Sequence, residues 1–571
     1  MTTSSNPVPD ISILARARAA LSGAEAIVAA VGGRVAELCG PAGDFDLAAL
    51  NRHQAEAHGY AWMASYLEIL RATLGWAEEL EARGKFGELP RLLVEIGFGE
   101  YLAQLGHGIA MSQDEIIRPD RYGLDDEARR FLAAPQVRSF TSNGSRTRAS
   151  LIALLRQSGP DAVVDSGDAG DETAAMIRRE FKAYAREKIA PHAPAWHQAN
   201  ALIPMDLVAE LARLGVFGMT TPPEFGGSGL GAEAMCVVTE ELSAGYIGVG
   251  SLGTRSEIAS ELIRLGGTQE QREYWLPRIA SGETLPTAVF TEPNTGSDLA
   301  NLTTRARREG DVYHVYGAKT WITHAARADL MVLLARTGEP NSGHRGLTMF
   351  LAEKPRGTDG DPFPAHGMSG GEIHVLGYRG MREYELGFDG FEIPAANVLG
   401  GVEGQGFRQL MTTFELARIQ TAARALGVAQ NAFELGFRYA LERIQFGQPL
   451  IEFPRVYGKL AWMAAEQAMV RQLVKRAARL KETGARCDVE AGMAKLVAAR
   501  VAWSAADNAL QIHGGNGYAN EYPISRLLCD ARILNIFEGA AEIQAQVIAR
   551  GLLQGGRGKD ARSGAAGRQP L

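Results

Sequence analysis

Three short segments of this 571-residue chain combine residue types that could bind a ligand or move a proton. In the first, FTEPNTGSD (290–298), hydroxyls and a glycine surround Pro293, so backbone amides could approach a bound molecule closely. In the second, Trp321 and Thr323 flank an isoleucine, and an indole near a hydroxyl could stack on a flat ring and hydrogen-bond its edge. A surface turn and a core tryptophan on a strand are the respective structural alternatives.

The third segment consists of QIHGGNGY (511–518) followed by NIFEGAAEIQ (535–544). Its Gly-Gly-Asn-Gly turn offers bare backbone N–H groups to an anionic ligand. Glu538 stands in an apolar run, and removal from water would raise the pKa of its carboxylate, which would make it a plausible general base. A helix-capping or solvated glutamate is the alternative.

The elements that must position these segments are mainly helical. Met63, Leu67, Leu70 and Leu74 recur at helical spacing, which predicts a helix with one apolar face. A polar, acidic and Gly-containing stretch after residue 156 is typical of a linker. The expected division is an N-terminal helical extension at 1–156, a linker at 157–171, a helical domain at 172–285, a β domain at 286–403, a helical bundle at 404–554 and a flexible tail at 555–571.

The predicted β domain contains short β-prone runs separated by Gly, Pro and Asp, without helices between them. The piece GDVYHVYGAKTWIT (310–323) is predicted to be a hairpin. Such spacing indicates a small antiparallel barrel or sandwich. The runs are 286–291, 312–315, 319–323, 330–335 and 347–352.

Composition excludes several classes of protein. Hydrophobic residues make up 46% of the chain, as in ordinary globular proteins, and a net charge of −7 argues against a nucleic-acid surface. We expect no membrane span, and the polar residues 1–10 lack the basic flank and apolar core of a signal peptide. The four scattered cysteines form no CxxC pair and no HExxH occurs, so we expect no disulfide, no metal site and a cytoplasmic location.

Together and in this order, the segments resemble the acyl-CoA dehydrogenase family, from about residue 172 to residue 553. PPEFGGSGLG (222–231), FELARIQ (414–420) and RIQFG (443–447) add to the match. The resemblance implies an α+β fold that is mainly α, with a helical domain, a small antiparallel β-barrel domain and a C-terminal four-helix bundle. The N-terminal helical extension is an additional domain.

The resemblance also implies that the protein binds FAD. It puts Thr291 near the edge of the isoalloxazine ring, Trp321 against the ring and Thr323 at its N5 side. Because some of the implied contacts reach the FAD of a neighbouring subunit, the protein is expected to be a homo-oligomer. The remaining implied cofactor residues are Phe290 and Ser297, and, toward the neighbouring subunit, Arg443, Phe446, Gln511, Gly514 and Gly515.

Glu538 occupies the family's catalytic-base position, and Arg418 should lie near the CoA or the base. In the implied reaction, Glu538 removes the α-proton of an acyl-CoA while the β-hydrogen leaves as hydride to the flavin. Hydrogen bonds from the Glu538 N–H and a flavin ribityl hydroxyl would stabilise the enolate charge on the thioester oxygen. The electrons would then pass to electron-transferring flavoprotein.

Three features depart from the common family pattern. They are the long extension, the bulky and charged GYRGMREY (377–384), and alanines at 540 and 541, where a hydroxyl and a small residue are usual. The extension and MREYELGF (381–388) resemble members that oxidise (2S)-methylsuccinyl-CoA to mesaconyl-CoA in the ethylmalonyl-CoA pathway. The extension could also cover the surface where two dimers meet in family tetramers, which favours a dimer, or close the acyl pocket.

Methylsuccinyl-CoA is short and branched and carries a free carboxylate, so its pocket must neutralise one negative charge. We expect Arg255, aided by Thr254 and Tyr384, to bind this carboxylate, because a buried arginine needs an anionic partner. Pairing of Arg255 with Glu257 or Glu261 on its own helix is the alternative. Besides Arg255, Thr254, Tyr384 and Arg418, the substrate-binding candidates include Ser297.

Other activities are compatible with parts of this pattern. A dehydrogenase for another short branched or dicarboxylic acyl-CoA would use the same groups, and an acyl-CoA oxidase would let oxygen reach the flavin. The DNA-associated alkylation-response flavoprotein of the same fold should show a basic patch, against which the net charge counts. A helical scaffold protein would not be expected to keep Thr291, Ser297, Trp321, Thr323 and Glu538 together.

Overall fold

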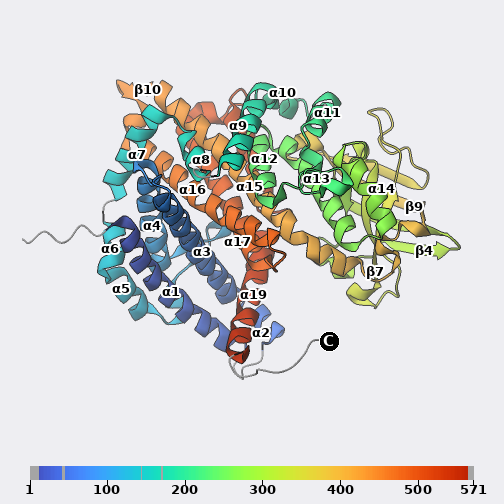
Figure 1. The fold of residues 1–571 in the computed structure, drawn as a ribbon, viewed down its shortest axis with the longest axis horizontal. Coiled ribbons are helices and arrows are strands. Elements are labelled where there is room, and N and C mark those ends of the chain that lie inside the picture. Colours follow the sequence, from blue (N-terminus) through green and yellow to red (C-terminus); the bar gives the residue numbers. More distant parts are fainter. Residues whose placement is uncertain (1–11, 41–44, 143, 169–170, 563–571) are drawn as a thin grey trace, which may run out of the picture.

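The fold combines an N-terminal helical extension, a helical domain, a β-rich domain and a C-terminal helical bundle (Figure 1). The computed structural model describes residues 12–40, 45–142, 144–168 and 171–562. Residues 1–10, where no signal peptide was expected, lie outside the described residues, as does 563–571 of the predicted tail. Within the rest of that tail, residues 555–562 are the end of helix α19 (Ala541–Arg562).

The extension is helical, as expected, with one small β pair. The predicted apolar face of Met63, Leu67, Leu70 and Leu74 is buried in α3. The elements of this part are α1 (Ile13–Leu38), α2 (Leu47–Arg52), α3 (Gln54–Ala82), α4 (Glu88–His107), β1 (Ile109–Ala110), β2 (Ile116–Ile117), α5 (Asp125–Ala133), α6 (Pro135–Thr141), α7 (Gly144–Ser158) and α8 (Ala162–Gly167).

Among the described residues, α1 alone is long and apolar enough to cross a membrane by length and composition. Alanines and valines raise the hydropathy of α1 around Glu25 and Arg34. In the fold, however, Ile27, Val31 and other residues of α1 are buried, and α1 packs against α3. In the extension, α1 therefore buries one face and leaves the rest of its surface outside the core.

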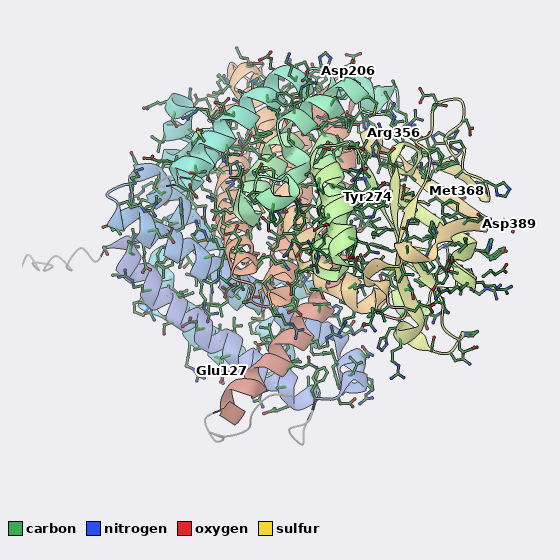
Figure 2. All side chains as sticks on the ribbon, turned by 45° about the vertical axis from the view of Figure 1, so that its right-hand side comes forward. Glu127, Asp206, Tyr274, Arg356, Met368 and Asp389 are labelled. Atoms are coloured by element: carbon green, nitrogen blue, oxygen red, sulfur yellow. The ribbon has the colours of Figure 1, made fainter. Side chains whose placement is uncertain are left out.

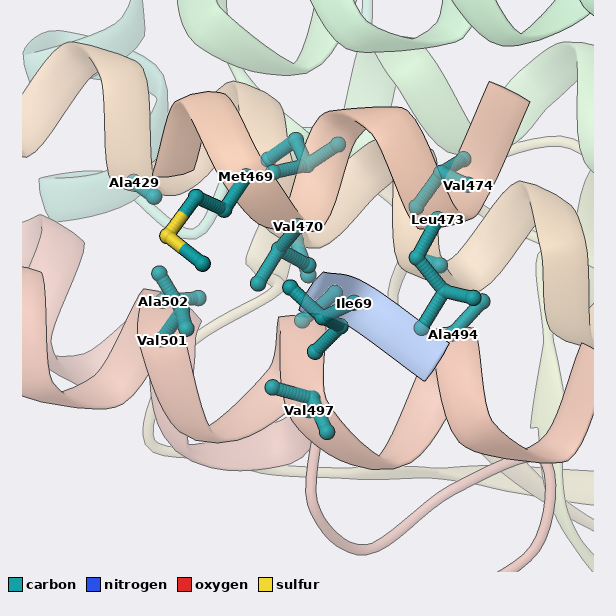
Figure 3. Packing of buried hydrophobic residues seen from close by; sticks show 14 of the residues in the cluster. Ile69, Ala429, Met469, Val470, Leu473, Val474, Ala494, Val497, Val501 and Ala502 are labelled. Carbon is teal, nitrogen blue, oxygen red and sulfur yellow. The ribbon is translucent and has the colours of Figure 1, made fainter. Parts of the chain in front are cut away.

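The extension shares one hydrophobic core with the C-terminal bundle. In Figure 3, Ile69 of α3 lies among Val470 and Leu473 of α16 (Pro454–Glu482) and Val497 of α17 (Asp488–His513). All four side chains are buried. The extension is therefore packed against the bundle and is not a tethered appendage.

The stretch predicted to be a linker is also packed. It contains α8, and Asp168 is buried, where it accepts hydrogen bonds from Arg178 of α9 and, at 2.5 Å, from Lys475 of α16. The polar composition of this stretch led to the linker prediction, but Asp168 is ion-paired inside the molecule. One of its partners, Lys475, is 307 positions away and cannot be recognised locally.

The next helical domain ends beside the sheet. Its helices α13 and α14 contribute Ile258, Leu262 and Trp275 to a hydrophobic cluster with strands of the sheet. The helices are α9 (Glu172–Tyr184), α10 (Ala193–Gln198), α11 (Met205–Arg213), α12 (Gly231–Gly245), α13 (Ile247–Gly266) and α14 (Gln269–Ala280).

The β domain is a curled seven-stranded sheet in which β5 and β9 pair antiparallel over most of their length. Two pairings, β3 with β6 and β4 with β6, are parallel. The sheet order is β3-β6-β4-β5-β9-β8, and β7 also pairs with β6. The strands are β3 (Pro286–Val289), β4 (Arg305–Glu309), β5 (Val312–Thr323), β6 (Leu330–Arg336), β7 (Leu347–Glu353), β8 (Met368–Ile373) and β9 (Glu383–Pro394).

The predicted hairpin at 310–323 is wrong in its placement of the turn. Val312–Thr323 is one continuous strand, and the turn before it joins it to β4. Gly317, with φ of 141°, and the register shifts near it bend the strand without reversing the chain. The glycine expected to mark a turn marks an irregularity of the strand.

Strand β6 is buried on both faces because the sheet has a core on each side. Leu330 and Val332 face α13 and α14, whereas Met331 and Leu333 face the core inside the curled sheet, as strand alternation requires. In Figure 2, Tyr274 marks α14 beside the sheet, and Met368 and Asp389 mark β8 and β9 farther out. This packing fixes the sheet next to the helices that carry the site.

The C-terminal bundle passes through the centre of the molecule in Figure 1. Its longest helix, α15, contacts α12, α16 and α17. The bundle consists of α15 (Gly406–Glu442), α16, α17, α18 (Pro523–Ile533) and α19 (Ala541–Arg562), with β10 (Ile444–Gln445) and β11 (Gln448–Pro449) between α15 and α16.

Candidate active site

Glu538 lies in the short connection between α18 and α19, in an unusual backbone conformation. Its φ is 53° and that of Gly539 is 92°, so two consecutive residues are left-handed. A Cβ at Gly539 would lie 1.9 Å from Nε2 of Gln544, so another residue there would be strained at this φ and would displace the Gln544 amide. A non-glycine residue at positive φ is costly, and such strain is concentrated at functional sites.

The Glu538 carboxylate is held by groups from two other helices. Nη2 of Arg255 in α13 donates to Oε1 at 2.5 Å, and Nη2 of Arg424 in α15 donates to Oε2 at 2.7 Å. The hydroxyl of Thr421 donates to Oε2 as well. The side chain of Glu538 is 14% exposed, so the solvated-glutamate alternative is wrong.

The prediction that the pKa of Glu538 would be raised is wrong. Burial raises the pKa, but the guanidinium groups of Arg424 and Arg255 and the hydrogen bond from Thr421 outweigh it, and the net effect lowers the pKa to about 2. The apolar sequence around Glu538 indicated desolvation correctly, but the cations come from α13 and α15. Glu538 is therefore ionised across the ordinary pH range.

Arg255 is buried in α13 and does not pair with an acidic residue of its own helix. Glu257 accepts a hydrogen bond from Thr220, and Glu261 pairs with Arg264 and Lys481. The alternative that Arg255 pairs on its own helix is therefore wrong. Its observed partner, Glu538, is 283 positions away.

Several donors beside the base lack a partner. Among the residues that the structure describes, no hydrogen bond is made by Nε of Arg255, Nε of Arg424 or Oγ1 of Thr254, although all three atoms are buried. Buried donors without acceptors cost free energy, and in a native protein each requires an explanation, such as an ordered water or a bound ion. An anionic group would satisfy them.

A second buried carboxylate, Glu383, lies on the sheet side of this cluster. It accepts hydrogen bonds from the Thr323 hydroxyl at 2.9 and 3.1 Å. Burial raises its pKa to about 7, while Thr323 and the charge of Arg255 lower it and the charge of Glu538 raises it. Thr323, Glu383, Arg255 and Glu538 thus form one group of coupled polar residues.

Sequence reasoning missed three residues of the site: Thr421 and Arg424, which bind the Glu538 carboxylate, and Glu383. Thr421 and Arg424 follow the predicted Arg418 by three and six residues in α15, about one and two turns further on. Arg418 is itself half-buried and stacks at 5.8 Å from the Phe414 ring, and no hydrogen bond or ion pair joins it to Glu538. The arginines of α15 are candidates that the sequence offers, but the sequence did not show which of them faces the base.

Tyr384 is not brought to Arg255. It packs edge-on against Phe363, with ring centroids 5.4 Å apart, in the core of the curled sheet. Since neighbouring residues of a strand point to opposite faces, Glu383 faces Thr323 and Tyr384 faces away. The segment 381–388 was recognised as unusual in the sequence. Within it, however, Glu383 reaches the site and Tyr384 does not.

The expected cofactor residues of the β domain lie around an exposed indole. Trp321 is 55% exposed and has a φ of 58°, at a register shift between β5 and β9, so it is not a core tryptophan. The nearby loop carries Thr291, half-buried, and Ser297, exposed. Thr291 accepts the Thr320 N–H at 3.0 Å, which ties this loop to β5.

The loop with Thr291 is anchored by a buried ion pair. Nζ of Lys319 contacts Oε1 of Glu292 at 3.0 Å and donates to the Phe290 carbonyl at 2.8 Å. Burial opposes ionisation of Glu292, but Lys319 and backbone donors from Thr303 lower its pKa to about 2. The loop is therefore a rigid, anchored element and not a free surface turn.

A second set of expected cofactor residues, separate from those of the β domain, is exposed at the C-terminal ends of α15 and α17. Phe446 is 94% exposed, and Ile444 and Tyr518 beside these segments are 60% and 89% exposed. A hydrogen bond of 3.0 Å from Asn516 to Tyr439 joins the two segments. The residues of this set are Arg443, Phe446, Gln511, Gly514 and Gly515, and all are exposed.

Comparison with known proteins identifies the class to which this fold and site belong. Family models described as the N-terminal, middle and C-terminal domains of acyl-CoA dehydrogenase match residues 171–283, 287–391 and 404–553. The chain belongs to the acyl-CoA dehydrogenase family, and it is a flavin-dependent oxidoreductase that acts on an acyl-CoA.

Among characterised relatives, the chain is 61% identical to (2S)-methylsuccinyl-CoA dehydrogenase of Cereibacter sphaeroides over 510 residues, 88% of this chain and 92% of the relative. Solved structures show the same fold. Butyryl-CoA dehydrogenase from Megasphaera elsdenii is 32% identical, with a TM-score of 0.62 over 66% of this chain and 98% of its own. A chain described under electron transferring flavoprotein of Acidaminococcus fermentans is also 32% identical, with a TM-score of 0.64 over 67% and 98%.

Proposed function

We propose that this protein oxidises (2S)-methylsuccinyl-CoA to mesaconyl-CoA, with Glu538 as the base that removes the α-proton. The observation that carries the proposal is the pair of buried arginines, Arg255 and Arg424, around this one carboxylate. Two cations exceed what a single base needs, and a substrate with a second carboxylate would supply the missing anion. The relative with 61% identity carries the name of this activity.

The unpaired donors support a carboxylate-binding role for this cluster. The Nε–H groups of Arg255 and Arg424, whose Nη2 atoms bind the base, and the hydroxyl of the adjacent Thr254 are buried and have no acceptor among the described residues. Arginine binds carboxylates in two-point geometry, so these donors fit the distal carboxylate of methylsuccinyl-CoA. Arg255 and Thr254 are thus proposed substrate-binding residues, and Arg424 joins them.

Arg255 and Arg424 would also control the pKa of the base, Glu538. With Arg255 and Arg424 both on Glu538, its pKa is about 2, which makes the carboxylate a weak base. A substrate carboxylate that draws one guanidinium toward itself would remove part of this stabilisation and raise the pKa of Glu538 toward a useful value. Binding of the correct substrate would therefore activate the base.

The backbone of Glu538 is suited to the thioester. Its N–H donates no hydrogen bond to any residue within the described ranges, although the connection that contains it is well ordered by bonds such as Ala541 N–H to Asn535 O at 3.1 Å. A free N–H beside the base can donate to the thioester oxygen and stabilise negative charge there during proton removal. Base and oxyanion donor would then belong to one residue.

The residues of the β domain fit FAD as the flavin. The exposed Trp321 can cover one face of a ring system. Thr323 belongs to the same strand, β5, and Thr291 belongs to the anchored loop, which the Thr320 N–H ties to β5. When bound, FAD would accept the β-hydrogen of the substrate as hydride. Phe290 and Ser297 belong to the same loop.

We propose a homodimer in the cytoplasm that passes its electrons to electron-transferring flavoprotein. The extension covers α16, whereas the exposed Phe446 and Tyr518 leave an apolar surface for a second copy. There Arg443, Gln511, Gly514 and Gly515 would reach the partner's FAD. The similarity to a chain described under electron transferring flavoprotein agrees with this electron acceptor. Light scattering of the full chain should give a dimer mass.

The test is a panel of methylsuccinyl-, glutaryl-, isobutyryl- and butyryl-CoA with an electron-accepting dye. We expect methylsuccinyl-CoA to give the highest kcat/KM and Glu538→Gln to abolish flavin reduction while FAD stays bound. Saturation by butyryl-CoA with no turnover of methylsuccinyl-CoA would overturn the substrate assignment. Fast reoxidation of the reduced protein by air would instead indicate an oxidase.

A further inference from the structure

Lys495 in α17 is a buried cation that the reaction described above does not use. It is 0% exposed, and its Nζ donates to the carbonyl of Gly539 at 2.5 Å, one residue beyond Glu538. Among the described residues no carboxylate lies within 4.0 Å of this ammonium group, since no ion pair of Lys495 is present. A buried ammonium without a close anion is expensive and requires a compensating role.

A second side chain holds the preceding carbonyl. Gln544 in α19 is fully buried, and its Nε2 donates to the Glu538 carbonyl at 3.2 Å. The two consecutive left-handed residues, Glu538 and Gly539, thus have both carbonyl oxygens bound by buried side-chain donors. With these two carbonyls fixed, the two peptide planes that follow Glu538 are fixed as well, which restrains the backbone that carries the Glu538 carboxylate.

We propose that Lys495 is a positioning residue for the base: through the Gly539 carbonyl it holds the left-handed connection that aims Glu538 at the substrate. The proposal rests on the function proposed for Glu538. Because left-handed conformations are unfavourable for a glutamate, the connection would relax if this donor were removed. A shift of about 1 Å at a reacting group can lower a rate by roughly a hundredfold.

The charges that surround Lys495 come from three elements. Arg418 and Arg424 face it from α15, Glu538 from the connection, and Glu542 from α19. Burial and the two arginines lower its pKa, the two carboxylates raise it, and the net pKa is about 7. The attraction between Lys495 and the two carboxylates therefore does little to offset the cost of burying its ammonium group. This argues against a role for Lys495 in stabilising the fold.

Because Lys495 has no close anion, its replacement should change stability and rate in different ways, and this difference provides a test. Replacing an unpaired buried cation by an apolar side chain of similar length should leave the melting temperature unchanged or raise it. For Lys495→Met we therefore expect an unchanged or higher Tm and normal FAD content. The rate of flavin reduction in single turnover should nevertheless fall about 10- to 100-fold, with little change in KM. A residue with a merely structural role would lose stability and rate together.

Lys459→Met is the matched control, because Lys459 also donates to a group of α17, the Asn508 side chain at 2.6 Å, but far from the connection. It should keep the wild-type rate. Lys495→Gln retains a donor without a charge and should recover part of the rate. It also serves as the test variant if Lys495→Met does not fold.

The outcomes separate this inference from the proposed function. If Lys495→Met and Lys495→Gln reduce the flavin at the wild-type rate while Glu538→Gln does not, Lys495 has no positioning role and the base assignment stands. If Glu538→Gln itself keeps the wild-type rate, the base assignment fails. A fall in rate that only accompanies a lower Tm would also reject the positioning role.

Discussion

Arg255 and Glu538 form an ion pair of 2.5 Å across 283 positions of sequence, in a site that also contains Arg424. The pair links the residue expected to bind the substrate carboxylate with the residue expected to remove a proton. A single contact therefore couples recognition to chemistry, because any anion that competes for Arg255 changes the electrostatic environment of the base. The predictions below follow from this coupling and from the packing that supports it.

Arg255→Met should change substrate choice more than overall activity. Loss of a charged hydrogen bond to the substrate corresponds to about a 10- to 100-fold decrease in kcat/KM for methylsuccinyl-CoA. For isobutyryl-CoA, which lacks the second carboxylate, the decrease should be much smaller. Steady-state kinetics on both substrates measures the difference. Arg264→Met, on the same helix but paired with Glu261, is the control. Equal losses for both substrates would show that Arg255 acts only on the base.

Arg424→Met should give the enzyme an acidic limb in its pH profile. In the wild type the pKa of Glu538 is about 2, so the base is ionised throughout pH 5–9 and causes no loss of kcat/KM there. Without Arg424, burial is less opposed and the pKa of Glu538 rises. The variant should then lose activity as pH falls and regain it as pH rises. A flat profile over pH 5–9 in the variant would contradict this account.

Lys319→Met should destabilise the loop that carries Thr291. The substitution leaves the buried Glu292 carboxylate without its ion-pair partner, which costs about 3–5 kcal/mol. We expect a lower Tm and weaker retention of FAD, measured by thermal unfolding and by flavin content after gel filtration. The double variant Lys319→Met with Glu292→Gln removes both charges and should recover part of the stability. If it is no more stable than the single variant, the ion pair is not what anchors the loop.

Ile69→Ala should weaken the contact between the extension and the bundle. Ile69 is fully buried among residues of α16 and α17, and truncation of such a side chain typically costs about 2–5 kcal/mol (Figure 3). Chemical denaturation should show the loss. Ile116→Ala, at a side chain that is 51% exposed, is the control and should change stability little. Independent unfolding of the extension in the wild type would contradict a shared core.

The amino-acid sequence by itself determined the family, the order of helical and β-rich parts and the candidate base. Periodicity identified the apolar face of α3, and β-prone runs identified the sheet, because both signals are local. The position of Glu538 followed from a resemblance carried by long motifs. Its role as the base remains a prediction that the Glu538→Gln variant tests.

Only the tertiary structure decided the electrostatics of the site. Local sequence around Glu538 is apolar and predicted a raised pKa, whereas Arg255 and Arg424 arrive from α13 and α15 and reverse the sign. The alternation of side chains along β9, in its place in the sheet, likewise decided that Glu383, and not Tyr384, faces the site. The physical reason is that Coulomb interactions and hydrogen bonds depend on separation in space, which packing of distant segments sets and spacing along the chain does not.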